Sequence, residues 1–212
     1  MSGFDRLAKP YRWMEYLSFG RALERCRFRF LPQLTDAKHA LVLGDGDGRF
    51  AARLLRAAPD VVIDAVDASP AMLAALHTRC GGERVVTHCA DLSVGLPDEL
   101  AAQRFDVVTT HFFLDCLTTA QVALLAQQLR PLLAEDARWV VSEFAVPEHG
   151  AMRWASRVVV RCLYVGFRLL TGLRPQQLPA YHDALQREGF AMVESVSSLG
   201  GLLVSEMWRK GA

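Results

Sequence analysis

Short apolar runs alternate with amphipathic stretches along most of the chain, and the stretches carry apolar residues at three- and four-residue spacings. This alternation is typical of a parallel sheet covered by helices on both faces. Two further apolar runs near the end are joined by too few residues for a crossover helix, so we expect them to pair antiparallel. The seven predicted strands are 39–44, 61–67, 84–91, 105–113, 138–144, 190–199 and 202–209.

The predicted helices begin and end at recognisable signals. Ser69-Pro70 is a good helix start, Thr118 or Thr119 can cap the long amphipathic helix, and Gly189 stops the last one. We interpret residues 1–36 as a helical extension that covers a substrate and 37–212 as one doubly wound α/β domain. The predicted helices are 4–17, 21–30, 49–58, 71–79, 119–133, 152–171 and 182–188.

Composition narrows the class of protein. A chain of 212 residues with 51% hydrophobic and 22% charged residues is expected to form one globular domain. The formal net charge of +1 argues against a protein held to nucleic acid by bulk charge. Five cysteines without a CxxC pair make a disulfide framework or structural zinc site unexpected, so we predict no metal and a cytoplasmic location. We see neither a signal peptide nor an apolar run long enough to span a membrane.

The first predicted strand ends in three glycines at alternate positions, Gly44, Gly46 and Gly48, with Asp45 and Asp47 between them. Such glycines allow a tight turn and a close approach of ligand to the main chain, where the next helix presents free N–H groups. A calcium loop is an alternative for alternating Asp and Gly. It is disfavoured because the remaining ligands of such a loop, notably a Glu at its twelfth position, are missing.

Two acidic residues follow the next strands. Asp67 ends the second strand, where a carboxylate can accept hydrogen bonds from both hydroxyls of a ribose. Asp91 ends the third strand, where an acceptor can meet the amine of an adenine. Each Asp alone is more often a cap or turn residue. Together with the glycine loop, the two residues outline an adenosine-binding crevice at the carboxyl edge of the sheet.

These motifs resemble those of class I S-adenosylmethionine-dependent methyltransferases. The similar segments are ALVLGDGDGRF, VDASPAML, CADL, FDVVTTHFFLDCL and LLAEDARWVVSEF. The resemblance implies the strand order 3-2-1-4-5-7-6 with strand seven antiparallel, and S-adenosylmethionine as cofactor. In addition to the residues above, it assigns cofactor contacts to Ala68, Ala90, Leu92, Thr110 and His111.

The segment FDRLAKPYRWMEYLSFGRALERCRFRF is similar to the opening of the ubiquinone/menaquinone-biosynthesis methyltransferases.

The sequence departs from the motifs of the class I methyltransferases at two places. Val42 occupies the position where the first motif usually has an acid, so Asp45 or Asp47 is expected to contact the methionine ammonium group. No Asn/Asp-Pro-Pro-Tyr follows the fourth strand, which counts against methylation of DNA adenine or protein glutamine.

Candidate catalytic residues follow the fourth predicted strand. If 111–115 is one helical turn, His111 and Asp115 face the same way and can act as base and orienter. A base is needed only where the nucleophile cannot lose its proton unaided. Alternatively, Asp115 caps the next helix and His111 packs or contacts only the cofactor. Substrate contacts are expected from Tyr11, Tyr16 and His149.

The predicted helix 152–171 carries Arg153, Arg157, Arg161 and Arg168 at helical spacings among many apolar residues. Such a helix can lie in a membrane interface or cover a lipid-like substrate. The alternatives are an ordinary cover helix with a solvated arginine face, or a contact between the two copies of a homodimer.

These features predict an enzyme of the methyltransferase class that acts on a small, hydrophobic, quinone-like or lipid-like acceptor. An NAD(P)-dependent oxidoreductase is the first alternative, since an acid at the second strand also serves the ribose of NAD. It is disfavoured because the loop is GxGxG rather than GxGxxG. A non-catalytic binding protein with the methyltransferase fold is the second alternative, favoured only by Val42.

Overall fold

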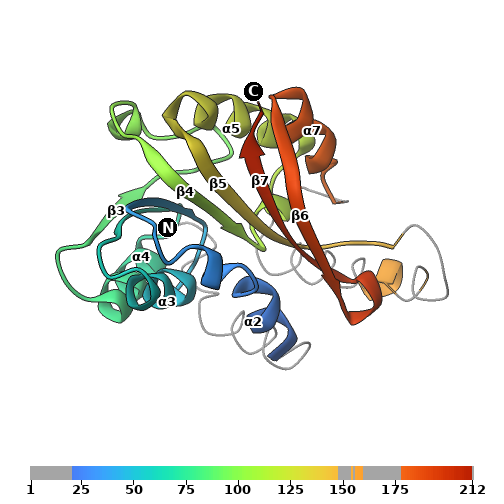
Figure 1. Cartoon of the computed structure of the whole chain (residues 1–212), viewed down its shortest axis with the longest axis horizontal. Helices are drawn as coiled ribbons and strands as arrows, with labels where there is room; N and C mark the ends of the chain where they lie inside the picture. Colours follow the sequence, from blue (N-terminus) through green and yellow to red (C-terminus); the bar gives the residue numbers. More distant parts are fainter. Residues whose placement is uncertain (1–20, 148–153, 155, 160–177, 212) are drawn as a thin grey trace.

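The computed structural model describes residues 21–147, 154, 156–159 and 178–211, and their strands form one seven-stranded sheet (Figure 1). Its order is β3-β2-β1-β4-β5-β7-β6, the order that the resemblance to methyltransferases implies. β7 is antiparallel to both of its neighbours, while the pairs among β1 to β5 are parallel. The strands are β1 (His39–Leu43), β2 (Val62–Asp67), β3 (Val85–Cys89), β4 (Phe105–His111), β5 (Leu133–Phe144), β6 (Phe190–Ser198) and β7 (Leu203–Lys210).

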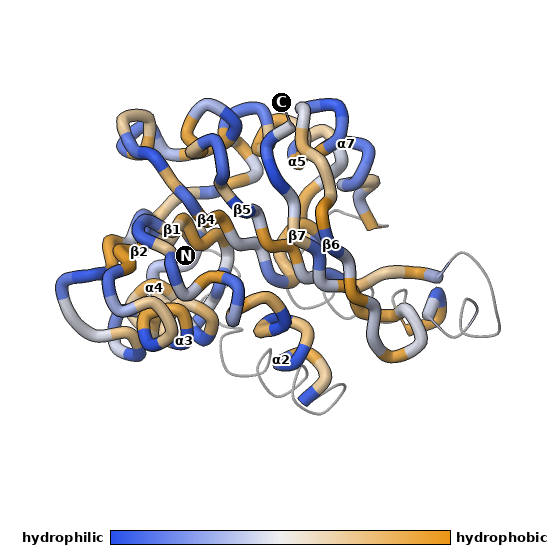
Figure 2. Tube along the Cα trace, in the orientation of Figure 1, coloured by the Kyte–Doolittle hydropathy of each residue, from blue (hydrophilic) through white to orange (hydrophobic). Residues whose placement is uncertain are grey.

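Helices cover both faces of this sheet (Figure 1). One face carries α5 (Thr119–Leu129) and α7 (Tyr181–Arg187), and the other carries α2 (Arg21–Arg27), α3 (Arg49–Ala57) and α4 (Pro70–Cys80). Each helix turns an apolar side toward the sheet, so the central strands are hydrophobic along most of their length (Figure 2). Short 3-10 helices lie at η1 (Leu31–Gln33), η2 (Asp98–Leu100), η3 (Leu114–Cys116), η4 (Arg130–Leu132) and η5 (Leu199–Gly201).

The core is divided by the sheet. Under α5 and α7, the indoles of Trp139 and Trp208 are fully buried together with Phe105. On the opposite side, Phe50 of α3 and Phe30 pack on the inner strands. Burial of such rings contributes roughly 2–3 kcal/mol each, which explains why short strands suffice to hold the sheet.

Two helix starts follow their predicted signals. The Ser69 hydroxyl accepts a hydrogen bond from the Met72 N–H at 3.3 Å, with Pro70 in the first helical position. Thr118 caps α5 in a reciprocal capping box with Gln121. Both caps fix where the chain leaves the carboxyl edge of the sheet, because they satisfy N–H groups that the helix itself leaves free.

Some boundaries differ from the prediction. The helix predicted over 119–133 ends at Leu129, because Pro131 has no N–H to continue it and the chain tightens into η4. β5 therefore begins at Leu133, earlier than predicted, and its pairing with β4 shifts register between Phe105 and Val107. Helix α2 ends at Arg27, earlier than the predicted 30.

Several predictions fall on other parts of the chain. The predicted helix 4–17 lies outside the described residues, and of 152–171 the structure describes only Trp154 and 156–159, which are helical. No helix in the described ranges is both long and apolar enough to cross a membrane.

Candidate functional site

The glycine loop connects β1 to α3 at the carboxyl edge of the sheet. Gly44 and Gly48 have φ of +67° and +79°, which side chains rarely adopt. A Cβ at Gly44 would lie 2.3 Å from Cδ2 of Phe113, and one at Gly48 would lie 2.9 Å from the Cα of Leu76. These two glycines are therefore required by the protein's own packing.

Gly46 differs from its two neighbours in the loop. A Cβ built there would meet only the Met72 sulfur, at 3.8 Å, although its φ of +59° also favours glycine. The middle of the loop is thus open, and a ligand can approach its main chain. This opening fits the predicted cofactor site.

Asp45 is buried and its carboxylate accepts hydrogen bonds from the N–H groups of Phe50 and Ala51, at 3.2 and 2.9 Å. Burial raises the pKa of Asp45 to about 6, while the charge of Arg27 and the two N–H bonds oppose this rise. Its position at the start of α3 is favourable for a negative charge, because free N–H groups point outward there.

Asp47 forms ion pairs with Arg79 at 2.7 Å and Arg49 at 3.2 Å. Both predicted candidates for the methionine ammonium group therefore already have partners within the loop and its neighbouring helices. The predicted contact with the ammonium group stays a prediction.

Asp67 lies at the tip of β2, next to the loop. Its Oδ1 accepts a hydrogen bond from the Ser69 N–H at 2.9 Å. Burial raises the pKa of Asp67, although hydrogen bonds from the main-chain N–H groups of Ser69 and Gly46 act in the opposite direction. The Ala90 N–H donates to the Asp67 carbonyl at 3.2 Å, which brings the third strand's end to the same place.

The other predicted residues of this edge are near neighbours in the chain. Ala68 is exposed, Leu92 is buried and Asp91 is exposed, with Oδ1 accepting the Ser93 N–H at 2.9 Å. The structure thus brings Asp67, Ala90 and the glycine loop together at the carboxyl ends of adjacent strands, as the sequence predicts.

Thr110 and His111 end β4 and point to opposite faces of the sheet. The buried Thr110 hydroxyl accepts a hydrogen bond from the Trp139 indole N–H at 3.0 Å. On the other face, His111 Nδ1 lies 2.9 Å from the Ser142 hydroxyl, and its ring packs at 4.3 Å from Phe50. Burial lowers the pKa of His111 well below its usual value, and the charge of Arg27 adds to this, so the imidazole is neutral.

Residues 111–115 do not form the single helical turn that the predicted pairing of His111 with Asp115 requires. His111 is still in the strand, Phe112 has φ of +55°, and η3 starts at Leu114. The positive φ turns the chain sharply, so the four-residue spacing does not place the two side chains on one helix face. The side chain facing His111 Nδ1 belongs to Ser142.

Asp115 instead lies beside a buried glutamate that the sequence reading did not select. Glu143 of β5 accepts hydrogen bonds on Oε1 from the N–H groups of Phe113 and Leu114, at 3.0 and 2.7 Å. Burial and the nearby Asp115 raise the pKa of Glu143 well above its usual value. Burial raises the pKa of Asp115 to about 6.

Arg27 was also missed. It is buried although it carries a charge, its guanidinium lies 5.7 Å from the centre of the Phe112 ring, and its charge acts on both Asp45 and His111. Arg27 therefore places a buried positive charge beside the glycine loop. An arginine in a predicted amphipathic helix gave no sequence signal that distinguishes it from a solvated one.

The remaining predicted site residues lie elsewhere. Tyr11, Tyr16 and His149 are outside the described residues, as are Arg153, Arg161 and Arg168 of the predicted arginine stripe. Arg157 is exposed. In the part of the chain that the structure describes, no group of three or more His, Cys, Asp or Glu side chains could hold a metal ion.

Residues 41–139 match a family model described as "Methyltransferase domain". This segment, slightly less than half of the chain, is thus similar to a methyltransferase domain. It contains the glycine loop, Asp67, Asp91 and the end of β4. No curated protein matches the sequence.

Solved structures share this fold. The mitomycin 7-O-methyltransferase MmcR is similar with a TM-score of 0.67 and 17% identity, over 100% of this chain and 61% of MmcR. Human N-acetylserotonin methyltransferase, solved with SAM, has a TM-score of 0.63 and 18% identity over 93% of this chain and 58% of the human protein. The chain thus spans about three fifths of these proteins' length.

A third structure is closer in size. The N-methyltransferase NodS from Bradyrhizobium japonicum WM9 has a TM-score of 0.61 and 15% identity, over 90% of this chain and 97% of NodS. The fold, the family match and the open loop all support S-adenosylmethionine as the cofactor. Nothing in these comparisons singles out the ubiquinone/menaquinone-biosynthesis group.

Proposed function

We propose that this protein is an S-adenosylmethionine-dependent methyltransferase that acts on a small, hydrophobic acceptor. The observation that carries the proposal is the glycine loop: it is closed by packing at Gly44 and Gly48, open at Gly46, and lies beside the Asp67 carboxylate. This arrangement offers main-chain donors and a diol acceptor on one edge of the sheet, which an adenosine-bearing ligand requires.

Different residues of the loop and its neighbours would bind the ribose, the adenine and the methionine portion of the cofactor. Asp67 accepts hydrogen bonds from the ribose hydroxyls, and Ala68, Ala90, Asp91 and Leu92 border the adenine. Arg27 is the cation next to the loop, and it pairs with the methionine carboxylate. The bound cofactor supplies a methyl group on a sulfonium, an excellent leaving group, so the protein mainly orients the acceptor.

Val42 does not weaken this assignment. Its side chain is buried in the core between sheet and helices, so it faces the interior of the fold. Asp45, three residues on, supplies a carboxylate at the start of α3. The loop therefore keeps an acid close to the place where the family motif has one.

The acceptor side of the crevice is apolar. Leu23 of α2, Phe112, Phe144 and Leu203 form a buried cluster at the end of β4 and β5. The Phe112 and Phe144 rings lie 5.3 Å apart. This apolar cluster beside the proposed crevice favours a hydrophobic acceptor. Two of the structural neighbours are a mitomycin 7-O-methyltransferase and an N-acetylserotonin methyltransferase, both named for small molecules.

Where the acceptor must lose a proton, the geometry favours Asp115 over His111 as base. Asp115 is half-buried, and its pKa of about 6 suits a base near neutral pH. His111 Nε2 is buried, and the lowered pKa makes it a weak base. We assign His111 to the cofactor side, oriented by Ser142.

The extension 1–36, with Tyr11 and Tyr16, and His149 after β5 belong to this proposal as parts of the acceptor cover. A quinone-like or lipid-like acceptor fits the apolar cluster and the arginine-rich segment around Arg157. Peripheral membrane contact or pairing of two copies through that segment also stays a proposal.

Incubation with S-adenosylmethionine and a panel of small aromatic, quinone and lipid metabolites, read by mass spectrometry, tests the function. We expect one class of apolar metabolite to gain a methyl group, with stoichiometric formation of the demethylated cofactor. The matched control is the Asp67→Asn variant, which should lose this gain at low cofactor concentration. Methyl transfer to protein or nucleic acid, but to none of the metabolites, would contradict the assigned acceptor.

A further inference from the structure

A second hollow lies outside the cofactor crevice, between α2, α3 and the β6–β7 hairpin. It encloses about 590 Å³ and is open to solvent on one side. The described residues that line it come from three separate parts of the chain. They are Arg21, Glu24, Arg25, Cys26, Phe28, Arg29, Arg53, Val196, Ser198 and Ser205.

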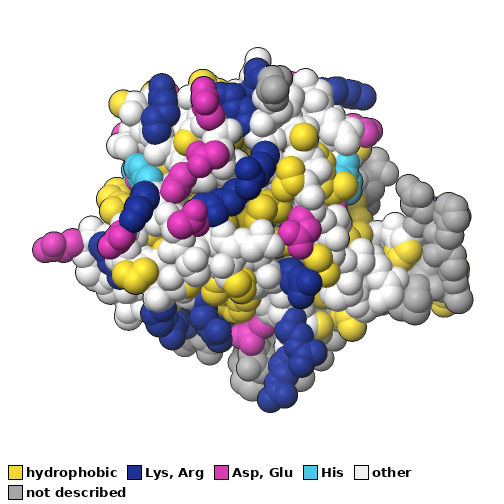
Figure 3. Space-filling model, viewed as in Figure 1, with side chains coloured by type: hydrophobic (Ala, Val, Ile, Leu, Met, Phe, Trp, Pro, Cys, Tyr) yellow, Lys and Arg dark blue, Asp and Glu magenta, His cyan; other side chains and the backbone are white. Residues whose placement is uncertain are grey.

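The lining is strongly basic. Among the described residues of the lining, four arginines and one glutamate give a formal charge of +3. Figure 3 shows dark-blue side chains gathered along the lower edge of this face, where α2 and α3 lie. In the described part of the chain, Arg21, Arg25 and Arg29 form no ion pair with a carboxylate. Arg21 and Arg25 are one helical turn apart, and like charges at this spacing destabilise a helix by a few tenths of a kcal/mol. The cluster therefore has an electrostatic cost that a bound anion would offset.

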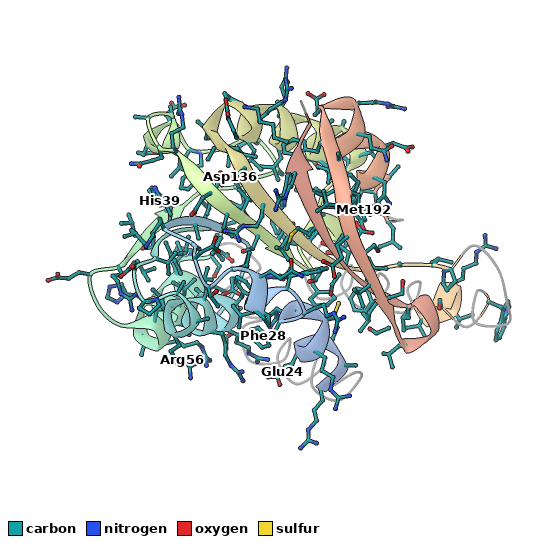
Figure 4. The ribbon with its side chains drawn as sticks, viewed as in Figure 1. Glu24, Phe28, His39, Arg56, Asp136 and Met192 are labelled. Carbon is teal, nitrogen blue, oxygen red and sulfur yellow. The ribbon has the colours of Figure 1, made fainter. Side chains whose placement is uncertain are left out.

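The hollow also offers apolar surface and hydroxyl groups. Phe28 follows the last residue of α2, and Figure 4 shows Phe28 and Glu24 on the same side of the molecule. The Arg53 guanidinium lies 4.9 Å from the centre of the Phe28 ring, which fixes the ring and one charge together. Val196 and Ser198 of β6 form the opposite wall.

We propose that this hollow binds a phosphate-bearing ligand whose apolar part lies against Phe28 and Val196. Guanidinium forks pair with phosphate oxygens in two parallel hydrogen bonds, and they are always charged. A single carboxylate would neutralise one of the three net charges, whereas a phosphate group or a diphosphate neutralises more of them. A free phosphorylated metabolite and an anionic lipid headgroup present the same group.

The floor of the hollow restricts the choice of test variants. Ser205 Oγ donates to the Cys26 carbonyl at 2.6 Å, and Ser142 Oγ donates to the same carbonyl at 3.3 Å. Because Ser142 also holds His111, changes at the floor would reach the cofactor side. The exposed pair Arg25 and Arg29 avoids this chain of contacts.

The test is titration calorimetry of the whole chain with inorganic pyrophosphate, together with co-sedimentation on phosphatidylcholine vesicles with and without phosphatidylglycerol. The double variant Arg25→Glu/Arg29→Glu should bind the preferred probe at least ~10-fold more weakly. The control Arg104→Glu/Arg187→Glu makes the same change of charge at exposed sites outside the hollow and should change binding by less than ~2-fold.

Binding of pyrophosphate identifies a free metabolite as the source, and binding of the anionic vesicles alone identifies a headgroup. The proposal is overturned if the wild-type chain binds neither probe, or if both double variants weaken binding equally. Both variants should keep the affinity for S-adenosylmethionine and the thermal unfolding midpoint. Failure of this proposal therefore leaves the methyltransferase assignment untouched, and the reverse also holds.

Discussion

The Phe113 ring packs directly over Gly44, so that a single added methyl group on the glycine would lie 2.3 Å from Cδ2 of the ring. The ring cannot retreat freely, because the main-chain N–H of Phe113 is held by the buried Glu143 carboxyl at 3.0 Å. Glu143 thus couples the end of β5 to the glycine loop. This contact determines the shape of the proposed cofactor site.

Gly44→Ala should therefore destabilise the protein by about 2–4 kcal/mol and abolish cofactor binding, since it combines a clash with a positive φ. The measurement is urea unfolding with titration calorimetry. Gly81→Ala is the matched control, because Gly81 also has a positive φ but nothing lies within 4 Å of its added Cβ. The control should lose about 1–3 kcal/mol yet bind the cofactor normally. Normal cofactor affinity in Gly44→Ala would contradict the role given to the loop.

Asp67→Asn should weaken binding of S-adenosylmethionine by ~10–100-fold, because the amide keeps one acceptor for the main chain and loses the second for the ribose diol. Calorimetry at fixed salt measures this directly. Glu83→Gln changes an exposed acid in the loop between α4 and β3 and should leave the affinity unaltered. Equal affinities for the wild type and Asp67→Asn would exclude Asp67 as the ribose acceptor.

Asp115→Asn should reduce kcat by ~100-fold for an acceptor that must lose a proton, with cofactor affinity changed less than ~3-fold. Since the pKa of Asp115 is about 6, the wild-type rate should fall as pH drops through 6, when the base becomes protonated. Because the pKa of His111 is lowered, loss of activity near pH 6 cannot come from that ring. Full activity and an unchanged pH profile in the Asp115→Asn variant would exclude Asp115 as the general base.

The carboxyl pair also makes stability depend on pH. Folding raises the pKa of Asp115 to about 6 and that of Glu143 well above its usual value. The contribution of Asp115 to stability is therefore complete below about pH 4 and is lost as pH rises through 6, while the loss for Glu143 has the same sign. The free energy of unfolding should decrease between pH 5 and 8, and Asp115→Asn should recover about 1–2 kcal/mol of that decrease. Urea unfolding at both pH values provides the comparison. An identical decrease in both proteins would show that the pair does not titrate in this range.

The alternation of apolar runs and helical stretches predicts the mostly parallel sheet, and the short connection before the last strand predicts the antiparallel β7, whereas the sheet order follows only from the resemblance to methyltransferases. Local signals such as Ser69-Pro70 and Thr118 have fixed chemistry, so the helix starts were predictable as well. The boundary of β5 was not, because Leu133 enters the strand only through pairing with Phe105, a contact distant in sequence.

The site was predictable where the backbone decides it and obscure where tertiary packing does. The glycines and the acids at the strand ends predict a cofactor crevice. Glu143 lies within an apolar run, and only the fold shows that it is buried against η3. Arg27 is indistinguishable in sequence from the solvated Arg25. The positive φ of Phe112, which separates His111 from Asp115, leaves no mark on the sequence.

Titration calorimetry of the wild-type chain with S-adenosylmethionine, its demethylated product and NADH tests the central claim most directly. We predict that S-adenosylmethionine and its product bind with one site per chain and that NADH does not bind. Binding of NADH alone would contradict the methyltransferase assignment and favour an oxidoreductase. Binding of none of the three would leave a fold without its cofactor and contradict the assignment equally.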